Sequence, residues 1–262
     1  MSGPLSGGAG DGMTEHPLLC TDPVVRAILA GRQTQDRRPV RCISRGYSLG
    51  WSDARQCDWP MIETADGEWV EHPGPCEPGD LFYVRECHRS WFPVDDEGQP
   101  VDAWHVRHRA DGSELVTDVD WDEVPQQLSP QEAGCDAEPA KWSPSIHHPK
   151  ALSRIWLRAL DVRPERLQDI TEEDAVAEGW EGPHWEDGRR ISLSDVRPMD
   201  APIGTGVAVE SIGHRMDFTA RGWFVGLWDR LYARRGYPWA NNPWVWRTEF
   251  EVASVTGRDN VR

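Results

Sequence analysis

Apolar and polar positions alternate along several short segments of the chain, and this pattern predicts strands. A period of two runs through residues 102–112, residues 79–87 form a turn followed by an apolar-rich strand, and residues 242–252 form a last strand. A longer alternating segment covers residues 153–170, where both phases contain apolar side chains. We therefore expect this segment to be a long strand that is partly covered on both faces.

Three other segments have the marks of helices. Residues 21–31 begin with a threonine and an aspartate that can cap a helix, carry a proline in the first turn and end at a glycine. In residues 170–179, Thr171 can cap a helix, acidic residues occupy the first turn and a glycine ends the segment. Residues 218–236 are amphipathic, with one apolar face formed by Trp223, Phe224, Leu227, Trp228 and Leu231. Strands interrupted by helices favour an α+β domain built around a small mixed β-barrel.

The remaining stretches predict insertions and tails around one domain. The chain has no apolar run near the roughly 18 residues that a membrane span needs. Its first residues lack the basic and apolar regions of a secretion signal, so we expect a cytoplasmic protein. We expect a single domain over residues 18–252, with tails at 1–17 and 253–262 and insertions at about 47–78, 111–140 and 180–217.

Charge is distributed unevenly along the chain, whose formal net charge is −16. Residues 111–138 hold nine acidic residues and no lysine or arginine. Residues 21–50 and 141–167 each carry six basic residues against two acidic ones, and 218–252 carry five arginines against three acids. Either acidic insertions surround a basic centre, or the charges are simply solvated surface. An acidic exterior disfavours binding to a long duplex, and the acidic insertions could contact a protein partner.

Metal and cofactor chemistry finds little support in the sequence. The six cysteines form no C-x-x-C pair, and the histidines lack the spacing of zinc ligands. We expect no metal and no cofactor.

Five segments in this order resemble the ASCH domain, a small PUA-like β-barrel: VVRAILAGRQTQDRRPV, GDLFYVREC, KWSPSIHHPKALSRIWL, VRPERLQDITEEDAVAEG and NPWVWRTEF. They are most similar to the long phage and prophage branch that is often labelled morphogenetic. ASCH domains are regarded as RNA-binding or nucleotide-binding modules. The resemblance therefore implies a phage-encoded protein whose cleft binds a nucleotide, a modified nucleobase or single-stranded nucleic acid.

A small bacterial branch of the same family hydrolyses acetylcytidine with a lysine, a threonine and a glutamate. Matched by position, these fall on Gln33, Asp36 and Glu178, so this chain lacks the amine and the hydroxyl of that nucleophilic route. Asp36 and Glu178 remain candidates for a catalytic carboxylate pair that activates water. A hydrolase acting on a modified base or on RNA is therefore one alternative, and a phage assembly or host-interaction protein is another.

The segment GRQTQDRRP at residues 31–39 is expected to be a loop and is the main candidate for ligand contact. Its guanidinium, amide and hydroxyl groups suit the phosphate and the base edge of a nucleotide: Arg32, Gln33, Thr34, Gln35, Arg37 and Arg38. Burying three arginines in structural ion pairs would be costly, which favours contact with an anion. The alternative for Arg38 is an ion pair with a buried carboxylate, such as Asp80 or Glu86.

Further candidate contacts lie outside this segment. Arg85 and Glu86 alternate along a strand, so only one of them can enter the cleft. Ser145 and His147 lie in a turn flanked by prolines, where a purely structural histidine is the alternative. Trp244 and Trp246 alternate with Val245 on the last strand, and an aromatic side chain there, with Trp244 as the candidate, could stack on a base; core packing is the alternative.

Overall fold

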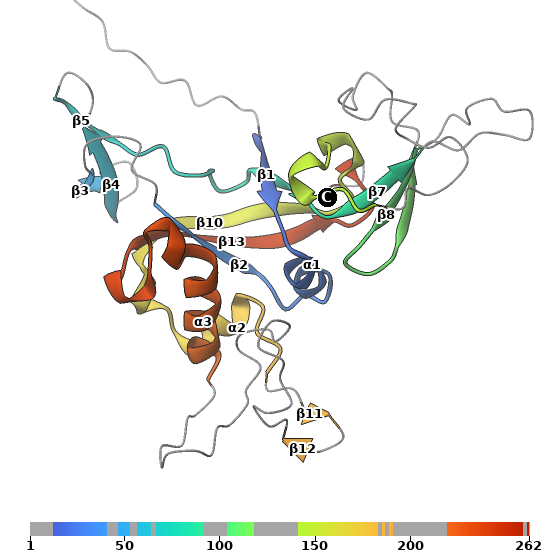
Figure 1. Cartoon of the computed structure of the whole chain (residues 1–262). Helices are drawn as coiled ribbons and strands as arrows, with labels where there is room; N and C mark the ends of the chain where they lie inside the picture. Colours follow the sequence, from blue (N-terminus) through green and yellow to red (C-terminus); the bar gives the residue numbers. More distant parts are fainter. Residues whose placement is uncertain are drawn as a thin grey trace, which may run out of the picture.

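The structure is a computed structural model, and it describes residues 13–40, 47–52, 57–63, 67–91, 104–117, 141–182, 185–186, 189–190, 219–258 and 261. These residues form an α+β fold, as the sequence predicts. A mixed five-stranded sheet occupies the middle of the molecule, with helices beside it and smaller sheets further out (Figure 1).

The central sheet has the strand order β1-β6-β10-β13-β2. Its strands are β1 (Glu15–Leu19), β6 (Leu81–Arg85), β10 (Trp156–Arg166), β13 (Trp244–Ser254) and β2 (Gln35–Pro39). The pair β1 and β6 is parallel, and the other neighbours are antiparallel. The pairings of the described residues do not close this sheet into a barrel, so the barrel remains a prediction.

Both ends of the described chain contribute to this sheet. β1 begins at Glu15, inside the segment that the sequence predicts as a tail, because its backbone pairs with β6 and buries Leu18. At the other end β13 extends to Ser254, and Arg258 pairs with Glu15 at 2.5 Å. Residues 15–17 and 253–254, which the sequence predicts as parts of tails, therefore belong to strands of the central sheet.

Three helices lie beside the sheet: α1 (Asp22–Leu29), α2 (Glu172–Ala177) and α3 (Ala220–Tyr232). The predicted cap of α2 is confirmed, because the Thr171 hydroxyl accepts from the Asp174 backbone N–H while the Asp174 carboxylate accepts from the Thr171 backbone N–H. The apolar face of α3 is confirmed in part, since Phe224 and Trp228 are buried but Leu231 is exposed. Among the described residues, short 3-10 turns add to the helical structure: η2 (Ser145–His147), η3 (Lys150–Leu152), η4 (Leu167–Asp169), η6 (Ala233–Arg235) and η7 (Trp239–Asn241).

Three smaller sheets lie around the central one. They pair β3 (Tyr47–Ser52) with β4 (Cys57–Glu63) and β5 (Trp69–Glu71), β7 (His88–Trp91) with β8 (Trp104–His108) and β9 (Glu114–Thr117), and β11 (Trp185–Glu186) with β12 (Arg189–Arg190). The predicted insertion at 47–78 thus contains the sheet β3-β4-β5. Most of the predicted insertions 111–140 and 180–217 lies outside the described residues.

The core consists of two apolar clusters. One lies between α1 and the central sheet and includes Val25, Ile28, Leu157 and Phe250. The other joins α2 and α3 to the end of the sheet through Ala175, Phe224, Trp228 and Val245. Among the residues that the structure describes, no helix is both long enough and apolar enough to cross a bilayer.

Candidate functional site

The segment 31–39 is not the loop that the sequence predicts, because residues 35–39 pair with β13 as the strand β2. Its charged side chains lie on both faces of that strand. Gly31 adopts φ +68°, which suits the end of α1, and β2 then alternates buried and half-buried residues. Gln35 and Arg37 are buried, whereas Asp36 and Arg38 are half-buried on the other face. The arginines of this segment therefore have different surroundings.

Arg37 lies inside a cluster of carboxylates. Its side chain is 0% exposed, its Nε donates to Glu165 at 2.6 Å and its Nη1 donates to Glu178 at 2.7 Å. Asp174 lies 3.4 Å from Nη2. Three carboxylates compensate for the desolvation of one guanidinium, which is why the sequence-based argument against burial does not hold. Arg37 is a structural residue, and the predicted phosphate contact is not available to it.

Glu178 is buried at the C-terminal end of α2 and lines a pocket of about 350 Å³. Burial raises the pKa of Glu178 to about 7, although the positive charge of Arg37 opposes this shift. Gln33 forms a β-bridge with Glu178 and lines the same pocket. We call this the helix pocket, because its other walls come mainly from α1 and α3: Pro23, Val24, Ala27, Trp223, Leu227, Arg230 and Leu231.

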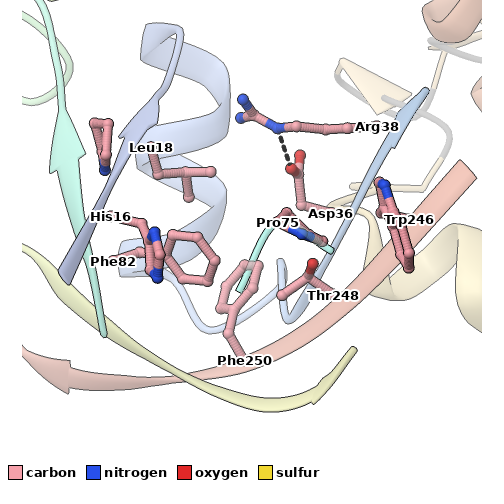
Figure 2. A pocket seen from close by; sticks show the side chains of 10 residues that line it. His16, Leu18, Asp36, Arg38, Pro75, Phe82, Trp246, Thr248 and Phe250 are labelled. Carbon is pink, nitrogen blue, oxygen red and sulfur yellow. Dashed lines mark hydrogen bonds and ion pairs between the residues drawn. The ribbon is translucent and has the colours of Figure 1, made fainter. Parts of the chain in front are cut away.

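Asp36 and Arg38 line a second pocket, of about 190 Å³, on the opposite face of β2. Figure 2 shows the Asp36 carboxylate facing this space, with the Arg38 guanidinium beyond it and bonded to it. The Arg38 Nε donates to Asp36 Oδ2 at 2.6 Å, and the Arg38 side chain is 41% exposed. The predicted alternatives for the partner of Arg38 were wrong: Asp80 binds His16, and Glu86 binds Arg154.

Aromatic side chains form half of the other lining residues of this second pocket, which we call the aromatic pocket. It is lined from β1, β6 and β13 by His16, Phe82, Trp246, Thr248 and Phe250, with Pro17, Leu18 and Pro75 alongside (Figure 2). His16 is fixed by a 3.0 Å contact between its Nε2 and Asp80. Trp246 is fixed by Trp59, whose ring centroid lies 4.9 Å away. These walls are therefore held by neighbours outside the pocket.

The structure does not bring Asp36 and Glu178 together as a catalytic pair. Asp36 belongs to β2 and Glu178 to the C-terminal end of α2, and each lines a different pocket. Each also has its own arginine, Arg38 for Asp36 and Arg37 for Glu178. The two carboxylates are therefore not arranged to activate one water molecule together.

The remaining candidates of the segment 31–39 face outward. Arg32 is half-buried and pairs with Glu181. Thr34 is exposed, and its backbone connects two elements: its N–H donates to Ala177 O at 2.9 Å, and its carbonyl accepts from Phe250 N–H at 2.9 Å. Neither side chain lines the aromatic pocket.

The candidates outside the segment 31–39 have structural contacts. Arg85 donates from Nε to the His148 carbonyl at 2.9 Å and also to the Ile146 carbonyl, so it holds the η2 turn that contains Ser145 and the exposed His147. Trp244 is half-buried and packs against the core, with the Arg166 guanidinium 4.4 Å from its ring centroid. These residues do not line either pocket.

Glu86 belongs to a buried polar cluster that the sequence analysis did not foresee. It is 0% exposed and accepts two hydrogen bonds of 2.9 Å from Arg154. His88, His108 and His148 are buried beside it, with the His88 and His148 ring centroids 4.4 Å apart. Burial lowers the pKa of His88 to about 3 and that of His108 to about 2. No group of ligands in the described residues is arranged to hold a metal ion, and we interpret the cluster as structural.

The residues of the aromatic pocket that sequence reasoning missed carried a weak signal. Trp246, Thr248 and Phe250 occupy one phase of the last strand, so the sequence does place them on one face. The sequence analysis considers Trp244 and Trp246 of this phase as stacking residues, whereas it does not consider Thr248 and Phe250. Their meeting with His16 and Phe82 depends on the strand order, which the pattern does not give.

Comparisons of the chain with protein-family models, with curated proteins and with solved structures found no match. The resemblance to the ASCH domain therefore stays a prediction, and the geometry of the pockets carries the functional argument.

Proposed function

We propose that the aromatic pocket binds one nucleobase, carried by a nucleotide, a modified nucleoside or a single-stranded nucleic acid. The observation that carries this proposal is the combination of aromatic walls with one carboxylate–guanidinium pair, Asp36 and Arg38, in a single pocket. Bases have flat faces that stack on aromatic rings and polar edges that need hydrogen-bond partners. The pocket offers both kinds of contact.

The size of the pocket supports a single ring system as the ligand. Its volume is about 190 Å³, below the roughly 300–1,000 Å³ that is usual for drug-sized ligands. A base could enter, while its sugar and phosphate would stay at the mouth. An extended duplex would also meet a chain with a formal net charge of −16.

Asp36 would read the polar edge of the base. A carboxylate accepts hydrogen bonds, so it suits the amino and imino groups of a base. Arg38 fixes one carboxylate oxygen, Oδ2, through its Nε. Thr248 adds a hydroxyl that can donate or accept on another wall of the pocket.

We favour binding over hydrolysis because the two candidate catalytic carboxylates line different pockets. The proposal of a water-activating pair would need both at one reacting atom. The third alternative, an assembly or host-interaction protein that uses its acidic insertions, depends largely on residues 118–140, which lie outside the described residues.

The test is a binding measurement on the full chain with two matched variants. Thermal shift and calorimetry would screen nucleosides, 5′-mononucleotides, acetylated and other modified nucleosides, and short single-stranded RNA and DNA. Asp36→Asn should lower the affinity for the bound ligand about ten- to hundredfold, by removing a base-edge contact. Glu178→Gln makes the same carboxylate-to-amide change in the helix pocket and should leave binding intact.

The outcomes separate the possible sites. If Glu178→Gln abolishes binding and Asp36→Asn does not, the ligand occupies the helix pocket and the proposal is wrong. If no ligand of the panel binds, the proposal is also wrong. Mass spectrometry of the recovered ligand would reveal a change in mass and revive the hydrolase alternative.

A further inference from the structure

We propose that His16 is a second base-reading residue of the aromatic pocket, and that together with Asp36 it selects guanine as the base of the ligand. This inference rests on the proposed function and specifies which base the pocket takes. The sequence analysis did not single out His16, because it lies in a segment that the sequence predicts as a tail.

Asp80 holds the His16 ring in one orientation. The His16 Nε2 lies 3.0 Å from Asp80 Oδ2, and the same carboxylate accepts from the backbone N–H groups of Thr14 and Glu77, both at 2.9 Å. Burial opposes the ionisation of Asp80, but these hydrogen bonds hold its pKa below the ordinary value. An ionised carboxylate can only accept hydrogen bonds, so the proton of the uncharged His16 ring is on Nε2.

The other ring nitrogen of His16 is available to a ligand. Nδ1 makes no hydrogen bond within the described residues. The ring lines the aromatic pocket next to Phe82, and the two ring centroids are 5.8 Å apart. Because the proton is on Nε2, Nδ1 carries a lone pair. His16 therefore gives the pocket a hydrogen-bond acceptor whose position Asp80 fixes.

Asp36 provides a second acceptor from another strand. Its Oδ2 accepts from Arg38, whereas its Oδ1 makes no hydrogen bond within the part of the chain that the structure describes. His16 lies on β1 and Asp36 on β2, which are the two edge strands of the central sheet. Figure 2 shows the two side chains on different sides of the pocket. A ligand in this pocket would therefore meet two separate acceptors.

Two acceptors select a base with two donor groups. Among the four common nucleosides of RNA, only guanosine has two donor nitrogens on its base, N1–H and the 2-amino group, whereas adenosine, cytidine and uridine each have one. We assign N1–H to Asp36 Oδ1 and the 2-amino group to His16 Nδ1. The Thr248 hydroxyl also lines the pocket and makes no hydrogen bond to a described residue, so it can donate to O6 of guanine.

A purely structural His16 leads to a different expectation. In that role it would only hold Asp80 and the turn at Glu77. Its replacement would then change the stability of the fold and not the choice of base. The choice of base therefore separates the two roles.

Calorimetry on the full chain would measure the binding of guanosine, inosine, adenosine, cytidine and uridine to the wild type, to His16→Phe and to His147→Phe. Inosine differs from guanosine only in lacking the 2-amino group. Phenylalanine keeps an aromatic ring at residue 16 but removes Nδ1. His147 is exposed in η2 and lines neither pocket, so the control makes the same chemical change away from the site.

In the wild type, guanosine should bind roughly tenfold or more tightly than inosine and the other three nucleosides. His16→Phe should lower the ratio of guanosine affinity to inosine affinity toward one, and His147→Phe should preserve it. A wild-type ratio near one, tighter binding of another nucleoside, or an unchanged ratio in a folded His16→Phe would each overturn the inference and leave base binding standing. If His16→Phe does not fold, the wild-type comparison decides alone.

The failure of the inference differs from that of the proposed function. If none of these five nucleosides binds, the selection of guanine is wrong. The modified nucleosides and the short single-stranded RNA and DNA then decide whether the aromatic pocket binds a base at all.

Discussion

Replacing Arg37 with methionine should destabilise the protein far more than replacing Arg38, although the two residues are neighbours on β2. Arg37→Met keeps an apolar stem but removes the cation that Glu165, Asp174 and Glu178 share. The Arg37 side chain is 0% exposed, whereas that of Arg38 is 41% exposed and pairs with one carboxylate. Arg38→Met is therefore a matched control on the same strand.

The expected magnitudes follow from these surroundings. Breaking a buried ion pair by removing one partner costs about 3–5 kcal/mol of unfolding free energy, whereas an exposed pair contributes about 0–1 kcal/mol. We expect a loss in the first range for Arg37→Met and in the second for Arg38→Met. The three carboxylates left behind would repel one another, which places Arg37→Met toward the upper end of its range.

The loss for Arg37→Met should also grow with pH. Burial raises the pKa of Glu178 from 4.5 to about 7, and Arg37 opposes this rise, so the pKa increases further in the variant. An acid with a raised folded-state pKa destabilises the fold as pH rises from its unfolded pKa to its folded pKa. In the wild type this window closes near pH 7, and in the variant it extends above it. The difference in unfolding free energy should then increase by about 1 kcal/mol per pH unit above 7.

Urea denaturation of the wild type and both variants, followed by tryptophan fluorescence at pH 6, 7 and 8, would measure these differences. Similar losses for the two variants would refute the structural role assigned to Arg37. A loss for Arg37→Met that is constant over this pH range would refute the assignment of the raised pKa to Glu178.

Three further predictions concern the buried cluster at the other end of the sheet. Glu86→Gln should cost about 3 kcal/mol or more, because it removes the buried carboxylate that holds Arg154; a loss below about 1 kcal/mol in urea denaturation would contradict this. Unfolding free energy should fall as pH drops below the ordinary histidine pKa of 6.5, because burial lowers the pKa of His88 to about 3 and that of His108 to about 2, so protons bind mainly to the unfolded chain. His108→Asn should make this fall shallower by about 1 kcal/mol per pH unit, and an unchanged slope would count against it. Arg85→Ala should speed hydrogen exchange in residues 145–148, because Arg85 binds the carbonyls of Ile146 and His148, and unaltered exchange there would show that the turn holds without it.

Local patterns in the sequence predict most of the regular structure because they report on local forces. Alternation in GDLFYVREC and NPWVWRTEF places β6 and β13, and the capping residue Thr171 places the start of α2. Such local patterns do not predict that Arg37 is buried among carboxylates. Its carboxylate partners Glu165 and Glu178 are 128 and 141 residues away along the chain, so only the assembled sheet brings them together.

The candidate site was predicted in part for the same reason. The sequence singled out Asp36 and Arg38, which do line the aromatic pocket. The sequence alone could not distinguish these two residues from Arg37, because residues 31–38 were expected to be a loop. Side chains alternate between two faces only along a strand. The aromatic walls come from three strands that are far apart in the sequence, and only the strand order of the sheet brings them together.

The order of charges along β2 also favours the observed register of this strand against β13. Polar strands at the edge of a sheet usually have a weakly specified register, because no apolar face favours one alignment. Here a slip of one residue against β13 would turn both Asp36 and Arg38 toward Glu165 and Glu178 and move Arg37 to the opposite face. The two carboxylates would then face one acid together with one base, and the net positive charge that Arg37 now provides would be lost. The sequence QDRRP therefore favours the observed register through its charges, a task that apolar side chains perform in most other strands.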